Sequence, residues 1–294
     1  MKKIVVLMPC LMSDANREVY SKVIADRLEL KALGIIDQLV ILAIDFSPEE
    51  LDLFSEAVLI TDYVTKDRTI VGARNTLLKW FYDSDYDFAL WTDANERLTG
   101  TTKNDLYTLL NAVRNGLDVS VVFSTIGEIV YGQRIEARKR IEHLDEIILT
   151  RFKPTTSTMT LHFTLMVNIN KYFNYELFIP ETVDQSKGRP EDVVFAYMLD
   201  RALGSHLCPT IITSRISTSK STWSGLSRSV KASEVPIDKA WIRKNIAQVP
   251  VLREPDNTTL FIKRVALEKE KVTKYKERRK GAKGVRLLDL LDEK

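Results

Sequence analysis

The chain of 294 residues is poor in metal-binding and disulfide-forming side chains, with only two cysteines and three histidines. Cys10 and Cys208 cannot build a disulfide framework, and the scattered histidines do not complete a four-ligand structural zinc site. We interpret both cysteines as small buried apolar residues. No apolar run approaches the roughly 20 residues that span a bilayer, and the first residues lack the features of a signal peptide. We therefore expect a soluble cytoplasmic protein with no integral membrane association.

The sequence also lacks both common glycine-rich phosphate-binding patterns, Gly-x-x-x-x-Gly-Lys-Ser and Gly-x-Gly-x-x-Gly. A phosphate bound by this protein would have to be held by side chains or by a metal ion. The composition is otherwise that of a globular protein, with 45% hydrophobic and 28% charged residues. This length predicts about two domains, or one domain with an elaborated C-terminal part.

Charge is distributed unevenly, although the net charge is only +3. Residues 263–286 contain eleven Lys or Arg and three Glu, whereas the preceding part is mildly acidic. Such a basic segment is typical of contact with a polyanion or an acidic surface. The alternative is a solvated helix in which Glu and Lys pair at three- and four-residue spacing. The basic residues without nearby acidic partners, and so the candidate polyanion contacts, are Arg278, Arg279, Lys280, Lys283 and Arg286.

Continuous apolar runs alternate with helical periodicity in the first hundred residues. The run Ile4–Met8, closed by Pro9, is typical of a strand buried on both faces. Further strands are predicted at 38–45, 57–60 and 87–93, and helices at 16–33, after Ser47-Pro48-Glu49-Glu50, and at 68–83. This alternation predicts an α/β fold with a mostly parallel, doubly wound sheet flanked by helices.

The second half has a different pattern. We predict helices at 104–115 and 191–203, strands at 118–124 and 159–169, and a hydroxyl-rich loop at 213–225. His206 and Cys208 could join a site, but His206 follows the helix ending at Leu203-Gly204 and we interpret it as a C-terminal cap. The basic segment at the C-terminus is predicted to be helical.

Two predicted strands end in a carboxylate, Asp45 and Asp93. Open parallel sheets bind ligands beyond the carboxyl ends of their strands. The run Asp93-Ala94-Asn95-Glu96 offers oxygen atoms that could hold Mn²⁺ or Mg²⁺ against a diphosphate. The alternative for Asp93 and Asn95 is a turn in which the side chains cap the next segment.

Two further sets of charged residues are candidates: Arg74, which could place a guanidinium over the same edge, and Glu191 with Asp192 in the second half. Arg74 could pair with a phosphate, or form an ordinary surface salt bridge. Glu191 and Asp192 open a predicted helix, where the helix dipole favours acids. Asp192 could instead serve as a general base for an acceptor hydroxyl.

In their order along the chain, these residues resemble the landmarks of the GT-A glycosyltransferases over roughly residues 1–210. The matching residues are Pro9, Asp45, Ala73-Arg74-Asn75, Asp93-Ala94-Asn95 and Arg189-Pro190-Glu191-Asp192. The resemblance implies that Pro9, Asp45 and Arg74 contact the nucleotide, and that Asp93 and Asn95 take the Asp-x-Asp positions that bind ribose and metal. It also implies that Glu191 lies near the acceptor and that Asp192 is the candidate base.

The resemblance further implies a UDP-sugar donor and a division of the chain. Residues 1–100 would bind the nucleotide-sugar and 101–212 would form the acceptor side, followed by C-terminal elements at 213–262 and a basic tail at 263–294. Two departures from the family pattern leave metal dependence open. Asn95 replaces a carboxylate, and Arg215 lies near the position of a further metal-binding histidine.

The acceptor is not determined by these motifs. The basic tail favours a polyanion, such as DNA carrying hydroxymethylated or already glycosylated bases, as modified by bacteriophage enzymes that act in the host cytoplasm. A cell-surface glycan is an alternative acceptor. A sugar nucleotidyltransferase and a nonenzymatic nucleic-acid-binding protein are the rival classes. The former normally has a glycine-rich loop after its first strand, which is missing here.

Overall fold

The computed structural model describes residues 1–62, 69–94, 96–98, 100–127, 145–152, 163–215 and 235–266. The strands are β1 Ile4–Leu11, β2 Gln38–Ile44, β3 Val58–Ile60, β4 Phe88–Trp91, β5 Glu96–Arg97, β6 Val121–Gly127, β7 Glu146–Phe152, β8 Thr164–Val167, β9 Ser205–Arg215 and β10 Leu260–Lys263. The helices are α1 Arg17–Ala32, α2 Pro48–Leu53, α3 Ile70–Tyr82, α4 Gly100–Arg114, α6 Ile169–Phe173, α7 Glu191–Leu203 and α8 Lys239–Ile246, with a 3-10 turn at Gln185–Lys187.

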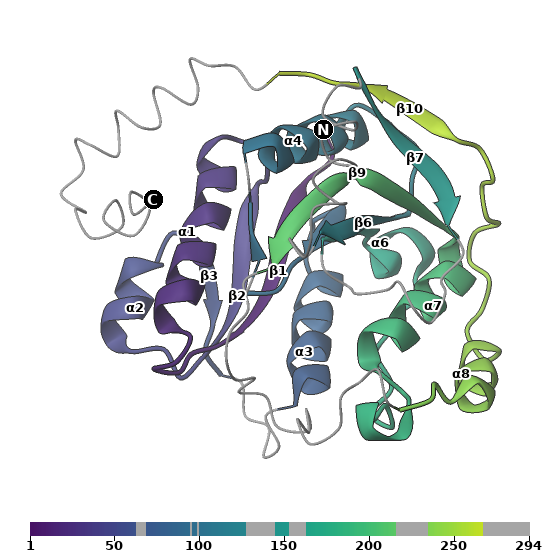
Figure 1. The fold of residues 1–294 in the computed structure, drawn as a ribbon, viewed down its shortest axis with the longest axis horizontal. Helices are drawn as coiled ribbons and strands as arrows, with labels where there is room; N and C mark the ends of the chain where they lie inside the picture. Colours follow the sequence, from purple (N-terminus) through teal and green to yellow (C-terminus); the bar gives the residue numbers. More distant parts are fainter. Residues whose placement is uncertain are drawn as a thin grey trace.

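The ten strands form one sheet in the order β10-β7-β9-β6-β8-β4-β1-β2-β3, with β5 beside β9. The N-terminal part, β3-β2-β1-β4, is parallel throughout, and helices flank the sheet (Figure 1). β8 runs antiparallel to both β4 and β6, so the sheet as a whole is mixed. The predicted α/β fold class is confirmed. No helix in the described ranges is long and apolar enough to cross a membrane.

β1 lies at the centre of the parallel part, and all eight of its residues are buried. The strand does not end before Pro9 as predicted but continues to Leu11. Pairing with β4 ends at Leu7, whose carbonyl accepts the last bond from the N–H of Thr92 at 3.1 Å. Backbone groups alternate in direction along a strand, so the nitrogen of Pro9, two residues after Leu7, points toward the β4 side. The N–H that Pro9 lacks would therefore not have bonded to β2.

Local signals placed the N-terminal helices correctly. Ser47 caps α2 in a full capping box with Glu50, and Pro48 occupies the first helical position. Gly34 follows the end of α1 with φ of 68°, a conformation that glycine adopts without strain.

The C-terminal half departs from the predictions in several elements. β7, α8 and β10 were not predicted, and residues 213–215, expected in a loop, belong to β9. His206 does not cap α7; Gly204, with φ of 67°, ends that helix and His206 is buried in β9. β8 has all four residues buried rather than alternating, and it lies inside the sheet between β4 and β6. Residues 159–162 of the predicted strand and 216–225 of the predicted loop lie outside the described residues.

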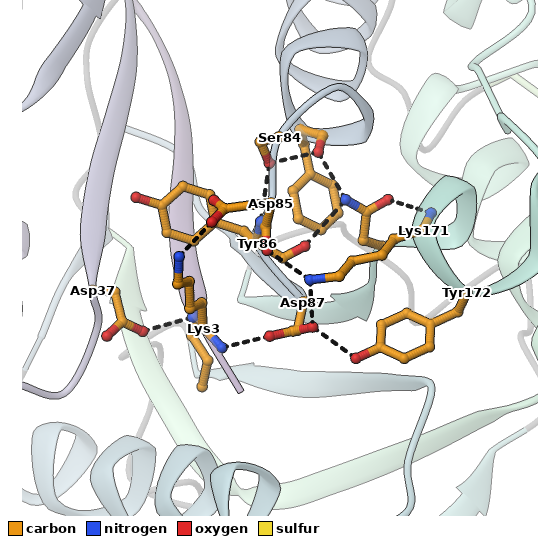
Figure 2. Close-up of polar contacts among 11 residues, drawn as sticks. Lys3, Asp37, Ser84, Asp85, Tyr86, Asp87, Lys171 and Tyr172 are labelled. Atoms are coloured by element: carbon orange, nitrogen blue, oxygen red, sulfur yellow. Dashed lines mark hydrogen bonds and ion pairs between the residues drawn. The ribbon is translucent and has the colours of Figure 1, made fainter. Parts of the chain in front are cut away.

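A cluster of polar side chains lies at the edge of the sheet where β1 and β4 begin (Figure 2). Asp87 accepts hydrogen bonds from the backbone N–H of Lys3 and the hydroxyl of Tyr172, both at 2.7 Å, and lies 2.8 Å from Nζ of Lys171. Asp37 accepts the N–H of Ile4 at 2.7 Å. These contacts satisfy backbone groups at the strand starts and leave the opposite edge for Asp45 and Asp93.

Candidate functional site

The candidate site lies at the edge where the parallel strands end. β1 pairs with β2 on one side and β4 on the other, and the chain reaches β4 only after passing through β3 and α3. This reversal of strand order is a topological switch point, where open α/β sheets bind ligands beyond the carboxyl ends of the strands. Asp93 follows β4 at this edge, with Thr92 between them.

Arg74 is the centre of the site. It lies in α3 with only 3% of its surface exposed. Nη1 donates to Oε1 of Glu191 at 3.3 Å, and Nη2 donates to Oδ1 of Asp93 at 3.4 Å. The guanidinium also lies 6.0 Å from the ring centre of Trp91. Residues from α3, the segment after β4 and the start of α7 therefore meet.

The charges of Arg74 and of the neighbouring carboxyl groups shift one another's pKa values. Burial alone would lower the pKa of Arg74, but the charges of Asp93, Glu191 and Asp192 outweigh it and raise that pKa. Burial and the charge of Asp192 raise the pKa of Glu191, against the opposing effect of Arg74. Nε of Arg74 is buried and has no hydrogen-bond partner among the described residues. The site thus has one guanidinium close to three carboxyl groups, and Nε of that guanidinium is a hydrogen-bond donor without a partner among the described residues.

Asp192 is the second residue of α7, and its Oδ1 accepts the N–H of Val193 at 2.8 Å. Pro190 is the N-cap and no side-chain hydrogen bond caps the helix. The helix-dipole interpretation and the functional interpretation of Asp192 are thus both compatible with its position, because the first turn of α7 opens beside Arg74.

The remaining predicted residues are placed as follows. Pro9 is buried within β1, and Asp45 is exposed directly after β2 with φ of 58°. Asn95 lies outside the described residues, as do Arg278, Arg279, Lys280, Lys283 and Arg286.

Two charged residues of α1 support the segment that bears Asp93, and sequence analysis missed them. Arg27 is fully buried, its Nε lies 3.5 Å from Oγ1 of Thr92, and its guanidinium stacks 4.8 Å from the ring centre of Phe163. Asp26, 2% exposed, accepts the N–H of Leu98 at 3.4 Å. The only available signal was that these two charges fall among the apolar positions of the helix.

Asn75, next to Arg74, binds the backbone of a distant segment. Its amide donates to the carbonyl of Ile179 at 2.8 Å and accepts the N–H of the same residue at 2.9 Å. One turn and two turns further along α3, Lys79 contacts Glu176 at 3.0 Å and the hydroxyl of Tyr82 donates to the carbonyl of Leu177 at 2.8 Å. α3 therefore holds the segment that leads to α7.

The described residues do not themselves complete a metal site. Within these ranges no group of three or more His, Cys, Asp or Glu side chains is arranged to hold a metal ion. Asp93 supplies a carboxylate of the type that hard cations prefer. The predicted pair of Asp93 with Asn95 therefore stays a prediction.

The similarity between this chain and known proteins is in three-dimensional structure. No family model matches the chain, and no curated protein matches its sequence. A mycobacterial protein of solved structure matches with a TM-score of 0.50 and 13% identity, over 90% of this chain and 85% of that one. Residues 1–349 of TarS from S. aureus, solved in complex with UDP-GlcNAc, match with a TM-score of 0.47 and 13% identity, over 83% of this chain and 65% of that one.

Glucosyl-3-phosphoglycerate synthase from Mycobacterium tuberculosis, solved with Mn²⁺, UDP-glucose and phosphoglyceric acid, matches with a TM-score of 0.42 and 11% identity, over 74% of this chain and 72% of that one. This chain spans less than two thirds of the TarS fragment. At these identities the comparisons concern the fold alone, which is α/β with a mixed, largely parallel sheet.

Proposed function

We propose that this protein is a glycosyltransferase that moves a sugar from a nucleotide-sugar, a UDP-sugar, to an acceptor hydroxyl. The observation that carries the proposal is the contact of Arg74 with both Asp93 and Glu191 at the switch point of the sheet. Residues 1–100 then form the donor half and 101–212 the acceptor half. In this proposal Pro9 and Asp45 contact the nucleotide.

In this proposal the donor diphosphate binds beside Arg74. Nε of Arg74 can donate a hydrogen bond to a phosphate oxygen. Nη1 and Nη2, which here bind carboxylates, can donate to phosphate oxygens as well. Asp93 orients the donor through its ribose. As the bond between the anomeric carbon and the diphosphate breaks, UDP leaves with the electron pair, and Arg74 stabilises the charge that develops on it.

Asp192 acts on the acceptor. In an inverting reaction its carboxylate takes the proton of the acceptor hydroxyl while the oxygen forms the new bond to the anomeric carbon. In a retaining reaction Asp192 only positions the acceptor, and an oxygen of the departing diphosphate takes the hydroxyl proton. Glu191 lies at the junction between the two substrates because it already contacts Arg74.

We infer that a divalent cation, Mn²⁺ or Mg²⁺, accompanies the donor. One guanidinium faces Asp93, Glu191 and Asp192, so an incoming diphosphate meets a site that is already negative. Asp93, with Asn95, would hold the cation, which would neutralise phosphate charge when bound.

We infer that the acceptor is a polyanion. DNA with hydroxymethylated or already glycosylated bases is the acceptor to test first. The start of the basic segment is fixed to α4. Arg264 donates to both carboxylate oxygens of Asp105, at 2.9 and 3.3 Å, and the N–H of Val265 donates to Oγ1 of Thr108 at 3.2 Å. α4 belongs almost entirely to the proposed acceptor half, so the basic segment begins in contact with an element of that half.

The donor proposal is tested with a panel of nucleotide-sugars, including UDP-glucose and UDP-GlcNAc. We expect at least one to raise the melting temperature and to release UDP slowly by hydrolysis. Pyrophosphate release from UTP and a sugar 1-phosphate would instead favour a nucleotidyltransferase. Binding of DNA without any response to nucleotide-sugars would favour the nonenzymatic alternative.

The acceptor proposal is tested by replacing the five basic residues at 278, 279, 280, 283 and 286 with Gln. If they contact about five phosphates, the log-log salt dependence of binding to duplex DNA has a slope of about −4 to −5, and the variant flattens it. UDP release without acceptor should not change. Sedimentation with anionic vesicles is the comparison, because binding to vesicles and not to DNA would contradict the DNA version.

A further inference from the structure

The starts of α7 and α8 are joined by a compact polar junction. Nε and Nη2 of Arg189 both donate to Oδ2 of Asp238, at 3.0 and 2.8 Å. The N–H of Asp238 donates to the carbonyl of Gly188 at 2.9 Å. Two backbone segments separated by about fifty residues are thus linked by a side-chain pair and by a main-chain bond.

The carboxylate of Asp238 serves both helices at once. Its Oδ1 accepts the N–H of Trp241 at 3.0 Å and caps α8, while its Oδ2 binds Arg189. The Trp241 bond and the Arg189 contact hold the pKa of Asp238 below its ordinary value. The Arg189 guanidinium also lies 4.8 Å from the ring centre of Trp241, a stacking contact suited to a planar cation.

Gly188 allows the two backbones to touch. Its φ is 70°, and a Cβ at this position would lie 2.0 Å from the carbonyl oxygen of Pro236 and 2.9 Å from the nitrogen of Asp238. No other residue fits there without moving the backbone of one segment. The spacing between the α7 start and the α8 start is therefore set by direct contact.

This junction lies immediately before the two acids of the candidate site. Arg189 precedes Glu191 by two positions and Asp192 by three, with Pro190 between them restricting the backbone. The first turn of α7 has no side-chain cap of its own. Among the described residues, Arg74 binds Glu191 within this turn, and Asp238 binds Arg189 two residues before it.

We propose that Arg189 is a positioning residue that acts through Asp192, an inference that rests on the proposed function. Its paired hydrogen bonds and its stacking on Trp241 hold the first turn of α7 against α8. Held in this way, the carboxylate of Asp192 stays directed to the acceptor side of Arg74.

The test replaces Arg189 with Lys, which keeps the charge but removes the planar group that makes two hydrogen bonds and stacks. The readout is UDP release from UDP-glucose, or from the panel nucleotide-sugar that the wild type hydrolyses fastest. Because small misplacement of a catalytic group is costly, we expect kcat to fall about 10- to 100-fold with KM for the donor almost unchanged. In an Asp192→Asn background the same replacement should have little further effect, because the residue through which Arg189 acts is already lost.

The control is Arg253, which also pairs with an aspartate through two hydrogen bonds but lies away from α7, beside the residues that lead into β6. It binds Asp118 at 2.8 and 2.6 Å, and its side chain is 28% exposed against 25% for Arg189. Arg253→Lys should lower the melting temperature by a similar amount and leave kcat unchanged. A kcat for Arg189→Lys equal to that of this control, or independent losses in the double variant with Asp192→Asn, would overturn the proposal.

A second measurement separates this proposal from the proposed function. Hydrogen exchange of the backbone amides at 191–194 should be faster in Arg189→Lys than in the wild type and unchanged in Arg253→Lys. If the wild type releases no UDP from any donor, the glycosyltransferase proposal and the positioning of Asp192 for that reaction are wrong, while faster exchange still shows that Arg189 holds α7. Unchanged exchange in Arg189→Lys shows that the junction does not hold the first turn and overturns the inference.

Discussion

The guanidinium of Arg74 and the carboxylate of Glu191 lie 3.3 Å apart, although 117 positions separate them in the chain. Both side chains are largely buried, with 3% and 14% of their surfaces exposed. Removing one partner of such a pair leaves an uncompensated buried charge, at a cost of about 3–5 kcal/mol. In Arg74→Ala a loss of activity could not be separated from a loss of stability. Asp93 is therefore the better residue for testing the donor site.

Asp93→Ala should abolish or greatly weaken UDP release. The loss follows from removing the carboxylate that is proposed to contact the ribose or the cation. Arg74 keeps its contact with Glu191, so we expect the free energy of unfolding to fall by only about 1–2 kcal/mol. Asp52→Ala, at an exposed position of α2, is the control. Unchanged turnover in Asp93→Ala would contradict the site assignment, and loss of the folded state would indicate a structural role.

Asp192→Asn should lower kcat about 10²- to 10⁴-fold with donor affinity preserved, because a positioned general base contributes in that range. Stability should hardly change, since Asn is favoured at helix N-termini and its Oδ1 can still accept the N–H of Val193. Isothermal titration with UDP and the rate of UDP release measure the two effects separately. Activity within a few-fold of the wild type would exclude Asp192 as the base and favour a retaining reaction.

Removal of divalent cations should weaken donor binding. The reason is the excess of carboxylates around Arg74, which opposes a diphosphate unless a cation accompanies it. Titration of UDP in excess chelator, and then with Mn²⁺ or Mg²⁺ restored, measures the effect. Equal affinity for UDP in chelator and in Mn²⁺ would show that basic side chains alone hold the diphosphate.

Asn75→Ala should destabilise the fold more than Tyr82→Phe. The first change leaves both the N–H and the carbonyl of Ile179 without their partner, at a cost of about 2–3 kcal/mol. The second removes a single hydrogen bond to the carbonyl of Leu177, worth about 1 kcal/mol. Urea unfolding gives both values, and equal losses in the two variants would show that the Asn75 contact does not hold the segment before α7.

Acid should destabilise the protein partly through Asp87. Burial would raise the pKa of this carboxyl, but hydrogen bonds from Lys171, the N–H of Lys3 and Tyr172 outweigh burial and hold the pKa below its ordinary value. The ionised form therefore stabilises the fold above the unfolded pKa of about 3.9, and this contribution is lost as the pH falls through the lower folded pKa. Asp87→Asn should show a smaller loss of unfolding free energy from pH 5 to pH 2, with Asp52→Asn behaving as the wild type.

Much of the fold could be predicted from short-range patterns. The buried run of β1, the capping box of Ser47 and Glu50, and the bounds of α7 follow from periodicity and from capping chemistry within a few residues. β10 and α8 were not predicted because β10 has four residues and α8 has one buried position. Such short elements form because partners far along the chain pair with them, which a local pattern does not contain.

The sequence by itself determined the alternation of buried strands and helices, and with it the edge at which Asp45 and Asp93 end their strands. It also indicated Arg74 and Asp192 as residues able to bind a phosphate and to take a proton. Only the tertiary structure decided that Arg74 lies between Asp93 and Glu191, and that Arg189 is bound by Asp238. Helical and strand periodicity depend on neighbours within a few positions, whereas these ion pairs exist only after distant segments have been brought together by burial of the shared core.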